Sequence, residues 1–599
     1  MSATVFQQAV AAFQAGDMAA AKRQVDRVLA AQPRQPDALH LAALISRQLG
    51  RQLEALTQFE ASLKASPHQP VVLSNLGNLL RDLGRHDEAE QRYGRAVELM
   101  PQFADAWYQR GLLAMERHRS GDAVLHLTKA RELDPQPRVL AALASVQLEG
   151  GKPADALLTA RDFGRIAPMD ARAVALEARA LARLGDETAA QGLLQSGLGK
   201  VDDPASLHHE LGLLALERGD AREAMDCFRA AIRARPEFID AHRALNRLQW
   251  ERGDATFMES YRQALEQTPA CAPLHHNLAA ACIASGDEDG ATTVLERALD
   301  TAGSDPFLLH GLAVQYLKGG DLGRAREGFD RALASRPDEV RFLIDSANLC
   351  LREQQPDAAQ QAISRALAVS PHHQEAWAYQ GVLWRLAGDA RHDWLNDYDG
   401  LLRDYALPVP AGFASLPEFM QALASELAGR HTAVRQPLDQ SVRHGTQTTG
   451  VLLDDPHPLL VALRSAIDTC LQDYLGRLQR ESEHPLSSRL GRGARFAGSW
   501  SVSLGGEGYH ANHVHPLGWL SCCTYVMLPE AIGAGGEDRR GWIKFGETAL
   551  GLGDREQVAR AIQPRVGHCV FFPAYFWHGT FPFQETGRRL TVPCDFEPG

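Results

Sequence analysis

Basic residues are in short supply relative to acidic ones. The 599 residues include 62 lysines and arginines against 74 aspartates and glutamates, which gives a formal net charge of −12. A protein that binds nucleic acids usually presents an excess of basic side chains on at least one face. We therefore expect no nucleic-acid partner.

Long apolar runs are also absent. No stretch approaches the roughly 18 consecutive apolar residues of a membrane span, and residues 1–17 lack both the basic start and the continuous apolar segment of a secretory signal. We expect a cytoplasmic protein without membrane contact.

Cysteine is scarce and shows no pairing pattern. The nine cysteines are scattered, odd in number and never spaced as Cys-x-x-Cys. This favours reduced thiols that pack as small apolar side chains over a disulfide framework or a zinc ribbon. The sequence also has no phosphate-loop motif and no Gly-x-Ser-x-Gly motif, so two common classes of hydrolase lose their usual signal.

The chain does have enough apolar residues to fold. Hydrophobic residues make up 45% of the sequence, which excludes global disorder. At roughly 100 to 200 residues per domain, a chain of this length exceeds one core unless a repeat array fills much of it.

Such a repeat occupies the first two thirds of the chain. A glycine or a substitute recurs every 33 or 34 residues, at Gly16, Gly50, Gly84, His118, Gly151, Gly185, Gly219, Gly253, Gly286, Gly320, Gln354 and Gly388. Alanines such as Ala89 and Ala325 follow the turn position by five residues, and prolines such as Pro101 and Pro337 close the units. Small residues allow two helices to approach closely and proline ends a helix, so each unit is predicted to be a helical hairpin.

These residues resemble the tetratricopeptide repeat. The clearest unit runs from Pro70 to Pro101 and carries Leu76-Gly77, Ala89 and Tyr93. The resemblance covers about residues 1–390, or about eleven repeats, and implies an all-α superhelix whose concave face binds a peptide or protein. A dimerisation platform or a spacer is the alternative role, and a homo-oligomer stays open.

The sequence changes character after Gly388. We expect a capping helix at residues 394–405 and a linker, within a segment of residues 391–411, followed by helices at 416–427 and 458–478. Short β-branched and aromatic runs then appear at residues 498–504, 519–528, 542–545, 569–572 and 590–596. They predict antiparallel sheets that close into a jelly roll, with flanking helices, over residues 412–599.

Histidines gather in front of one of these strands. His513 and His515 are two residues apart, so in an extended segment both point to the same side. His578 follows His515 by 63 residues, at the edge of another predicted strand. The three imidazoles are candidate metal ligands, and His510 is an alternative to His513.

An arginine lies in the last predicted strand. Alternation places Arg589 and Thr591 on one face and Arg588 on the other. A guanidinium with a neighbouring hydroxyl can bind a carboxylate in a bidentate manner, so we expect an acidic cosubstrate.

Together these segments resemble the 2-oxoglutarate and Fe(II)-dependent oxygenases, in particular bacterial ones that carry tetratricopeptide repeats. The matching stretches, from about residue 395 onward, are residues 440–448, 500–504, 513–519, 525–529, 545–546, 572–580 and 589–591. The resemblance implies a double-stranded β-helix in which His513 and His578 bind iron and His515 stands where most relatives have aspartate. It also implies that Arg589 and Thr591, helped by Tyr525, hold the distal carboxylate of 2-oxoglutarate.

The implied cofactors are Fe(II), 2-oxoglutarate and O2, with ascorbate as a supporting reductant. The implied reaction couples oxidative decarboxylation of 2-oxoglutarate, which yields succinate and CO2, to oxidation of a second substrate.

Three histidines form an unusual set for this chemistry. The common triad of two histidines and one carboxylate provides an anionic ligand, whereas His513, His515 and His578 would provide three neutral ones. Such a site should bind the cosubstrate more strongly, retain iron less well and favour zinc or copper more. In the alternative, His515 is not a ligand and Glu507 or Asp538 supplies the carboxylate; Cys522 and Cys523 are further candidates, although small strand side chains are their usual role.

The leading hypothesis is an oxygenase that hydroxylates a peptide or protein presented by the solenoid. The alternative is a non-catalytic interaction scaffold with a metal-stabilised jelly roll. A glycosyltransferase is discounted, because some 200 β-rich residues leave no room for two nucleotide-binding α/β domains.

Overall fold

The computed structural model describes residues 2–83, 85–117, 119–438, 440–448, 451–491, 493–516, 518–532, 539–584 and 587–598. The repeat turn positions Gly84 and His118 and the candidate ligand Asp538 lie outside this part of the chain. Two compact units, Met1–Phe238 and Ile239–Gly599, are each described by themselves.

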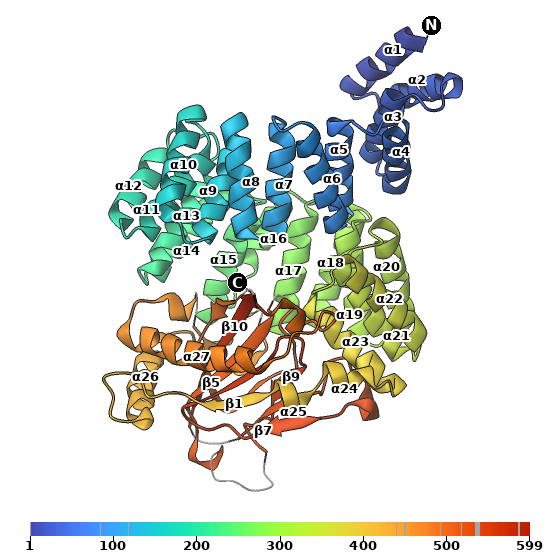
Figure 1. The fold of residues 1–599 in the computed structure, drawn as a ribbon. Coiled ribbons are helices and arrows are strands. Elements are labelled where there is room, and N and C mark those ends of the chain that lie inside the picture. Colours follow the sequence, from blue (N-terminus) through green and yellow to red (C-terminus); the bar gives the residue numbers. More distant parts are fainter. Residues whose placement is uncertain are drawn as a thin grey trace. The chain divides into compact units, whose positions relative to one another are not determined.

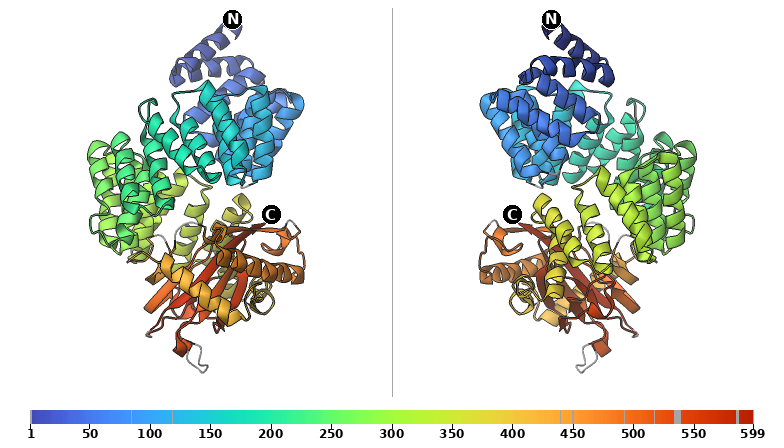
Figure 2. Two further views of the ribbon diagram at one scale, coloured as in Figure 1. Left: turned by 90° about the vertical axis from the view of Figure 1, so that its left-hand side faces the viewer. Right: turned by 90° about the vertical axis from the view of Figure 1, so that its right-hand side faces the viewer.

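The first unit consists of helices that pair as antiparallel hairpins and lie side by side (Figures 1 and 2). They are α1 (Ser2–Gln14), α2 (Met18–Ala31), α3 (Pro36–Gln48), α4 (Gln52–Ala65), α5 (Pro70–Asp82), α6 (His86–Leu99), α7 (Ala104–Glu116), α8 (Ser120–Leu133), α9 (Pro137–Glu149), α10 (Pro153–Ile166), α11 (Ala171–Arg183), α12 (Glu187–Gly197), α13 (Ala205–Glu217) and α14 (Ala221–Ala234).

The repeat residues explain this packing. At Gly77 a Cβ atom would lie 2.6 Å from Cε1 of Tyr93, so the two helices of that hairpin approach too closely for any larger residue. The turn glycines take a left-handed backbone, as at Gly16 with a φ of 79°, which glycine adopts without steric cost. The predicted substitute Gln354 takes the same conformation, with a φ of 59°.

The second unit begins with further hairpins. These helices are α15 (Ile239–Glu251), α16 (Glu259–Gln267), α17 (Ala272–Ser285), α18 (Glu288–Ala302), α19 (Pro306–Lys318), α20 (Leu322–Ser335), α21 (Val340–Arg352), α22 (Pro356–Val369) and α23 (Gln374–Ala387). The division between the units falls inside the predicted repeat region, and the domain limits near residues 390 and 411 stay predictions.

One predicted helix is wrong. Residues 394–405 do not form a single capping helix but two short helices, α24 (Arg391–Leu395) and α25 (Tyr398–Leu401), followed by strand β1 (Arg403–Ala406). The side chain of Asp397 accepts a hydrogen bond from the backbone N–H of Gly400 and starts a new helical turn. The next residues pair with β8 at a sheet edge, which satisfies backbone groups that a helix would otherwise have satisfied.

The C-terminal region is rich in antiparallel strands, as predicted. It contains α26 (Leu416–Arg430), β2 (Val442–Gln447), α27 (Pro458–Arg477), β3 (Ala494–Ser499), β4 (Val502–His510), β5 (Leu520–Met527), β6 (Ile543–Phe545), β7 (Arg560–Ile562), β8 (His568–Pro573), β9 (His578–Thr580) and β10 (Arg589–Pro598). One sheet has the order β1-β8-β5-β10-β4-β2, with β3 also paired to β10, and a smaller sheet has the order β7-β6-β9. The predicted fold class, a helical repeat array followed by a jelly-roll-like β region with flanking helices, is confirmed.

Two long helices cover the larger sheet (Figure 1). α26 contacts β5 and α27 contacts β8, and the ring of Tyr474 stacks on that of Phe571 at 5.5 Å between centroids. The two helices match the predicted segments 416–427 and 458–478. They cover one side of the β region.

The last repeat helices and the β region share one hydrophobic core within the second unit. Buried residues of α21 and α23 belong to the same cluster as those of β5, β8 and β10. The Tyr379 ring lies 6.1 Å from the Trp577 ring, and Arg385 donates a hydrogen bond of 2.8 Å to the backbone oxygen of Arg555. The strand that carries His578 is therefore supported directly by repeat helices.

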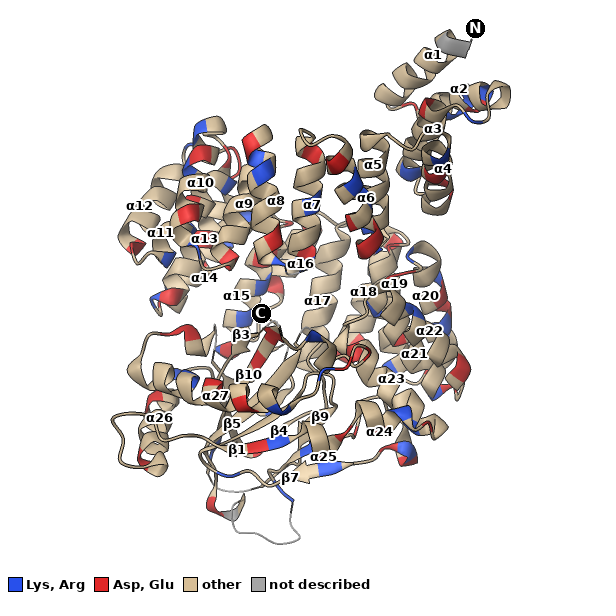
Figure 3. Cartoon of the chain, in the orientation of Figure 1, with Lys and Arg blue, Asp and Glu red and all other residues tan. Residues whose placement is uncertain are grey.

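Acidic and basic residues are interspersed along the repeat helices (Figure 3), in agreement with the modest net charge. None of the described helices combines the length and the apolar character needed to cross a bilayer.

Candidate metal centre

Three histidine side chains converge where the two sheets meet. His513 and His578 form a two-way backbone bridge, with N···O distances of 2.9 and 3.0 Å, which joins the segment after β4 to the start of β9. Alternation along the extended segment then brings His515 to the same side as His513. One ligand atom from each of the three residues lies within 4.8 Å of the other two.

The hydrogen bonds of the rings determine which nitrogen is available. Nδ1 of His513 lies 2.8 Å from the backbone oxygen of Ala511, and Nδ1 of His578 lies 2.9 Å from that of Phe576. A carbonyl oxygen only accepts, so each Nδ1 carries the proton and each Nε2 keeps its lone pair.

The third ring is held by a carboxylate. Nδ1 of His515 lies 2.5 Å from Oδ1 of Asp595, and the Ser521 hydroxyl donates to the same oxygen at 2.7 Å. This leaves Nε2 of His515 facing Nε2 of His513 at 3.2 Å. A carboxylate behind a ligating histidine orients the ring and increases its basicity.

The local electrostatics keep two of the rings neutral. Burial, followed by the charge of His515, lowers the pKa of His513 to about 3. Burial, and then His513 and His515, lowers the pKa of His578 well below its ordinary range. Burial also opposes a charge on His515, but the attraction and hydrogen bond of Asp595 outweigh it and raise the pKa of that ring. Neutral imidazoles are the form that binds metals.

The donor set fits a divalent transition metal. Two nitrogens bound about 2.1 Å from one ion, at an angle of roughly 90 to 109°, lie about 3.0 to 3.4 Å apart. The observed separation of 3.2 Å between the Nε2 atoms of His513 and His515 falls in this range.

A buried cationic site, formed by Arg589, Thr591 and Tyr525, lies on the strands next to the histidines. Thr591 pairs with Tyr525 across β10 and β5, and Arg589 is 1% exposed, with its guanidinium carbon 5.3 Å above the Tyr525 ring. After burial, the charge of Arg589 is the largest influence that lowers the pKa of His510, whose ring is 6.1 Å from that of His513. We call these three residues the Arg589 site.

The polar atoms of the Arg589 site lack partners. Nε and Nη1 of Arg589, the hydroxyl of Tyr525 and the hydroxyl of Thr591 are buried without a hydrogen-bond partner among the described residues. Each such group costs about 1 to 3 kcal/mol, and more when charged. A bound carboxylate would bring both hydrogen-bond acceptors and a negative charge to this site, so the donor set fits the distal end of 2-oxoglutarate.

Comparison with known families agrees with this geometry. Residues 498–595, which hold all three histidines and the Arg589 site, match the family described as "Putative 2OG-Fe(II) oxygenase". Residues 6–70, 77–116, 209–256 and 316–382 match tetratricopeptide-repeat families. The chain is a tetratricopeptide-repeat protein with a C-terminal domain of this oxygenase family.

Other proteins are similar to parts of this chain. "Cellulose synthase operon protein C" of Xanthomonas axonopodis is 28% identical over 267 residues, which is 42% of this chain and 17% of that protein's length. A tetratricopeptide-repeat protein from Parabacteroides merdae is 18% identical with a TM-score of 0.33, over 41% of this chain and 97% of that one. The C-terminal part of a repeat protein from Cytophaga hutchinsonii is 17% identical with a TM-score of 0.33, over 40% and 99%.

The other candidate ligands in the oxygenase domain do not belong to the group of three histidines in the part of the chain that the structure describes. His510 lies beside the cluster, and its Nδ1 is 3.1 Å from the hydroxyl of Ser441. Glu507 is exposed and, with a φ of 69°, occupies a turn in β4. Among the described residues neither one joins the group of three histidines. Asp538 lies outside the described residues.

The two strand cysteines are not in the donor group either. Burial, followed by hydrogen bonds with Cys569 and Cys594, raises the pKa of Cys522 well above its ordinary range. Burial raises the pKa of Cys523 to about 11. Both thiols are therefore protonated near neutral pH, and metal binding requires the thiolate.

Sequence reasoning missed Asp595 and Ser521. Asp595 is 80 residues from His515 and Ser521 is 74 residues from Asp595, so no local spacing connects them. One signal was available, because Asp595 is an acidic residue within a predicted strand and shares the alternation of Arg589 and Thr591.

Proposed function

We propose that this protein is an Fe(II) and 2-oxoglutarate-dependent oxygenase that hydroxylates a peptide or protein bound by its repeats. The observation that carries the proposal is the pairing of two features in one interior. One ring nitrogen from each of the three histidines lies within 4.8 Å of the other two. On the strands beside them, Nε and Nη1 of the buried Arg589 guanidinium have no hydrogen-bond partner among the described residues.

Each residue has a distinct part in this proposal. His513, His515 and His578 would hold Fe(II), and Asp595 would keep the His515 ring in its orientation with the proton on Nδ1. Arg589, Thr591 and Tyr525 would bind the distal carboxylate of 2-oxoglutarate. The bound iron and 2-oxoglutarate would supply the oxidising chemistry with O2, while the two sheets and their covering helices exclude water from the interior.

The repeats support the choice of a polypeptide as the second substrate. Stacked helical hairpins form extended surfaces that bind peptides and proteins, and in the second unit they share a core with the strands of the oxygenase domain. A peptide held by these helices would lie on the same rigid support as the metal centre.

Succinate formation tests the cofactor chemistry. The purified protein is incubated in air with Fe(II), ascorbate and 2-oxoglutarate, beside His578→Ala and Arg589→Ala variants. Arg480→Gln, which removes an exposed arginine from a segment outside the site, serves as the matched control. The expected result is slow turnover in the parent and the control and none in the two site variants.

A second measurement separates the oxygenase from the scaffold. The oxygenase predicts that 2-oxoglutarate raises the melting temperature only when a divalent metal is present, because both bind the same interior. No turnover together with no such coupling would reject the oxygenase and favour a non-catalytic interaction scaffold.

A further inference from the structure

A second pocket lies on the outer face of the larger sheet. It has a volume of about 390 Å³, and its lining includes Trp250, His431, Arg435, Thr446 and Arg588. Arg588 precedes Arg589 by one residue, so the two side chains lie on opposite faces of the strand. Ser503, which also lines the pocket, pairs with Leu590, which is on the same face as Arg588. Strand alternation therefore directs this outer pocket away from the Arg589 site.

The rim of the outer pocket is fixed at three points. The indole N–H of Trp250 in α15 donates to the backbone oxygen of Gln436 at 2.6 Å, and the backbone N–H of Val434 donates to that of Glu251 at 2.8 Å. The Gln436 side chain in turn accepts from the backbone N–H of His444 at 2.9 Å. The segment 431–436 is thus held between a repeat helix and β2, so the pocket is formed before any ligand binds.

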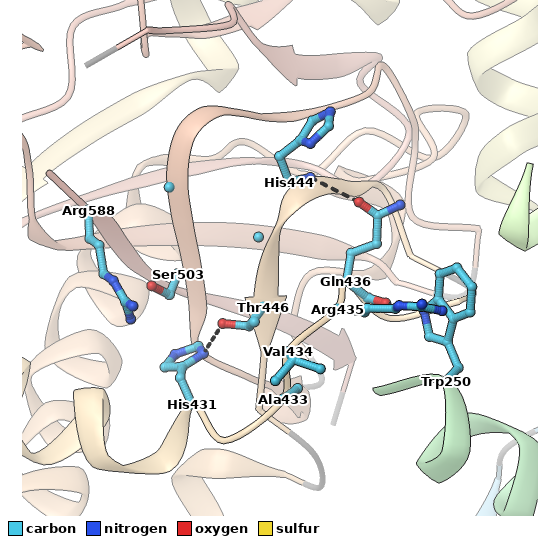
Figure 4. A pocket seen from close by; sticks show the side chains of 12 residues that line it. Trp250, His431, Ala433, Val434, Arg435, Gln436, His444, Thr446, Ser503 and Arg588 are labelled. Atoms are coloured by element: carbon cyan, nitrogen blue, oxygen red, sulfur yellow. Dashed lines mark hydrogen bonds between the residues drawn. The ribbon is translucent and has the colours of Figure 1, made fainter. Parts of the chain in front are cut away.

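The lining carries positive charge without a counter-charge. It contains two arginines and no acidic residue. Arg435 lies over the Trp250 ring at 4.6 Å, and no carboxylate of the pocket lining is available to pair with Arg435 or Arg588. Figure 4 shows the two guanidinium groups on opposite sides of the pocket, with the His431 and Thr446 side chains between them.

The His431 ring is already engaged in hydrogen bonds. Nδ1 of His431 lies 2.8 Å from the Thr446 hydroxyl, and its Nε2 lies 3.0 Å from that of Ser501. Burial, and then the charge of Arg588, lowers the pKa of His431 to about 4, so the ring is neutral near pH 7. His431 therefore serves as an uncharged part of the pocket wall, and the two arginines are the permanently charged groups of the lining.

We propose that the outer pocket binds an acidic segment of a polypeptide, whose carboxylates pair with Arg435 and Arg588. Paired guanidinium groups are a common means of recognising acidic peptide motifs. One wall of the pocket is a repeat helix, which favours a polypeptide over a free acid. The inference deepens the proposed function and rests on it only in taking the partner to be a polypeptide.

Direct binding tests the inference without any turnover. Fluorescence anisotropy of a labelled hexaglutamate peptide is measured against the full-length protein at low salt, with no Fe(II) and no 2-oxoglutarate. We expect saturable binding that weakens as salt rises, and that falls about tenfold or more in Arg435→Gln and in Arg588→Gln. Arg480→Gln removes the same charge from an exposed position outside the pocket and should bind as the parent does.

Three controls make the result decisive. A hexaglutamine peptide should not bind, Arg435→Lys and Arg588→Lys should retain part of the affinity, and circular dichroism should show that each variant is folded. Equal affinity of the parent and the double variant Arg435→Gln/Arg588→Gln would overturn the assignment. Binding of free glutarate to the pocket without binding of the peptide would also overturn the assignment, since the ligand would then be a small acid. Because the assay omits the cofactors, its failure is distinct from a failure of the oxygenase proposal.

Discussion

At the scale of single residues, the negative charge of the candidate metal centre lies one hydrogen bond behind the ligands. Nδ1 of His515 lies 2.5 Å from Oδ1 of Asp595. Burial alone would raise the pKa of the Asp595 carboxyl group, but the charge and hydrogen bond of His515 lower it. A ligand set of three histidines therefore does not leave the site without an anion. The carboxylate orients one ligand in place of binding the metal itself.

Replacement of Asp595 tests this role. We expect Asp595→Asn to weaken Co(II) binding, used as a stable substitute for Fe(II), by about 10 to 100-fold, because the amide neither orients nor polarises the ring as a carboxylate does. Isothermal titration calorimetry measures the change. Asp554→Asn, at an exposed position in the same domain, is the control, and equal affinities for the two variants would contradict the role.

Tyr525 offers a second test at this scale. Its buried hydroxyl has no partner among the described residues, whereas the buried hydroxyl of Tyr474 donates to the backbone oxygen of Leu401 at 2.9 Å. Tyr525→Phe should therefore leave the melting temperature unchanged or higher and weaken metal-dependent 2-oxoglutarate binding about tenfold. Tyr474→Phe should do the reverse, with lower stability and normal binding. Normal binding in Tyr525→Phe would remove this hydroxyl from the site.

At the scale of elements, a charged network joins three repeat helices. Arg341 in α21 pairs with Asp345 in the same helix and with Glu375 in α23, and His310 in α19 lies 2.8 Å from Asp345. Burial works against the charge on Asp345, but Arg341 and His310 lower its pKa to about 2, from an ordinary 3.8. At Glu375 the effect of burial outweighs the attraction of Arg341 and raises the pKa of the carboxyl group.

The network predicts a loss of stability in acid. Asp345 binds its proton more weakly in the folded chain, so its contribution is complete above about pH 4 and disappears as the pH falls through about 2. A shift of this size corresponds to about 2 kcal/mol at neutral pH. Urea unfolding followed by circular dichroism at pH 7, 5 and 3 should show a smaller acid loss in Asp345→Asn than in the parent. The same acid loss in both proteins would mean that other groups dominate.

The elements also show how far the sequence determines the fold. The repeat helices were predictable because Gly, Ala and Pro keep one phase over many units and each has a local physical role. The strand at Arg403–Ala406 was not, because four residues have no periodicity to read and their pairing partner lies in β8. In the same way, His513 and His515 were found from their spacing, whereas Asp595 joins them only through the pairing of β10 with β5.

At the scale of the molecule, the second unit combines two kinds of structure around one core. Leu383 in α23 is buried in the same cluster as Phe571 in β8 and Tyr575. Leu317 in α19 is equally buried, at 4% exposure for each, but belongs to a separate cluster within the repeats. The shared core means that damage to the last repeats should reach the strands of the oxygenase domain.

Hydrogen exchange can separate these two positions. Leu383→Ala and Leu317→Ala should each cost about 2 to 5 kcal/mol, because each leaves a cavity of similar size. Only Leu383→Ala should also speed amide exchange in β8, because Leu383 belongs to the same buried cluster as the residues of β8. Leu317→Ala should instead affect α19 to α21. Mass spectrometry of peptides from residues 306–352 and 568–573 measures both. If β8 kept the exchange rate of the parent in both variants, the repeats and the strands would unfold independently, and peptide binding on the repeats would have no mechanical route to the metal centre.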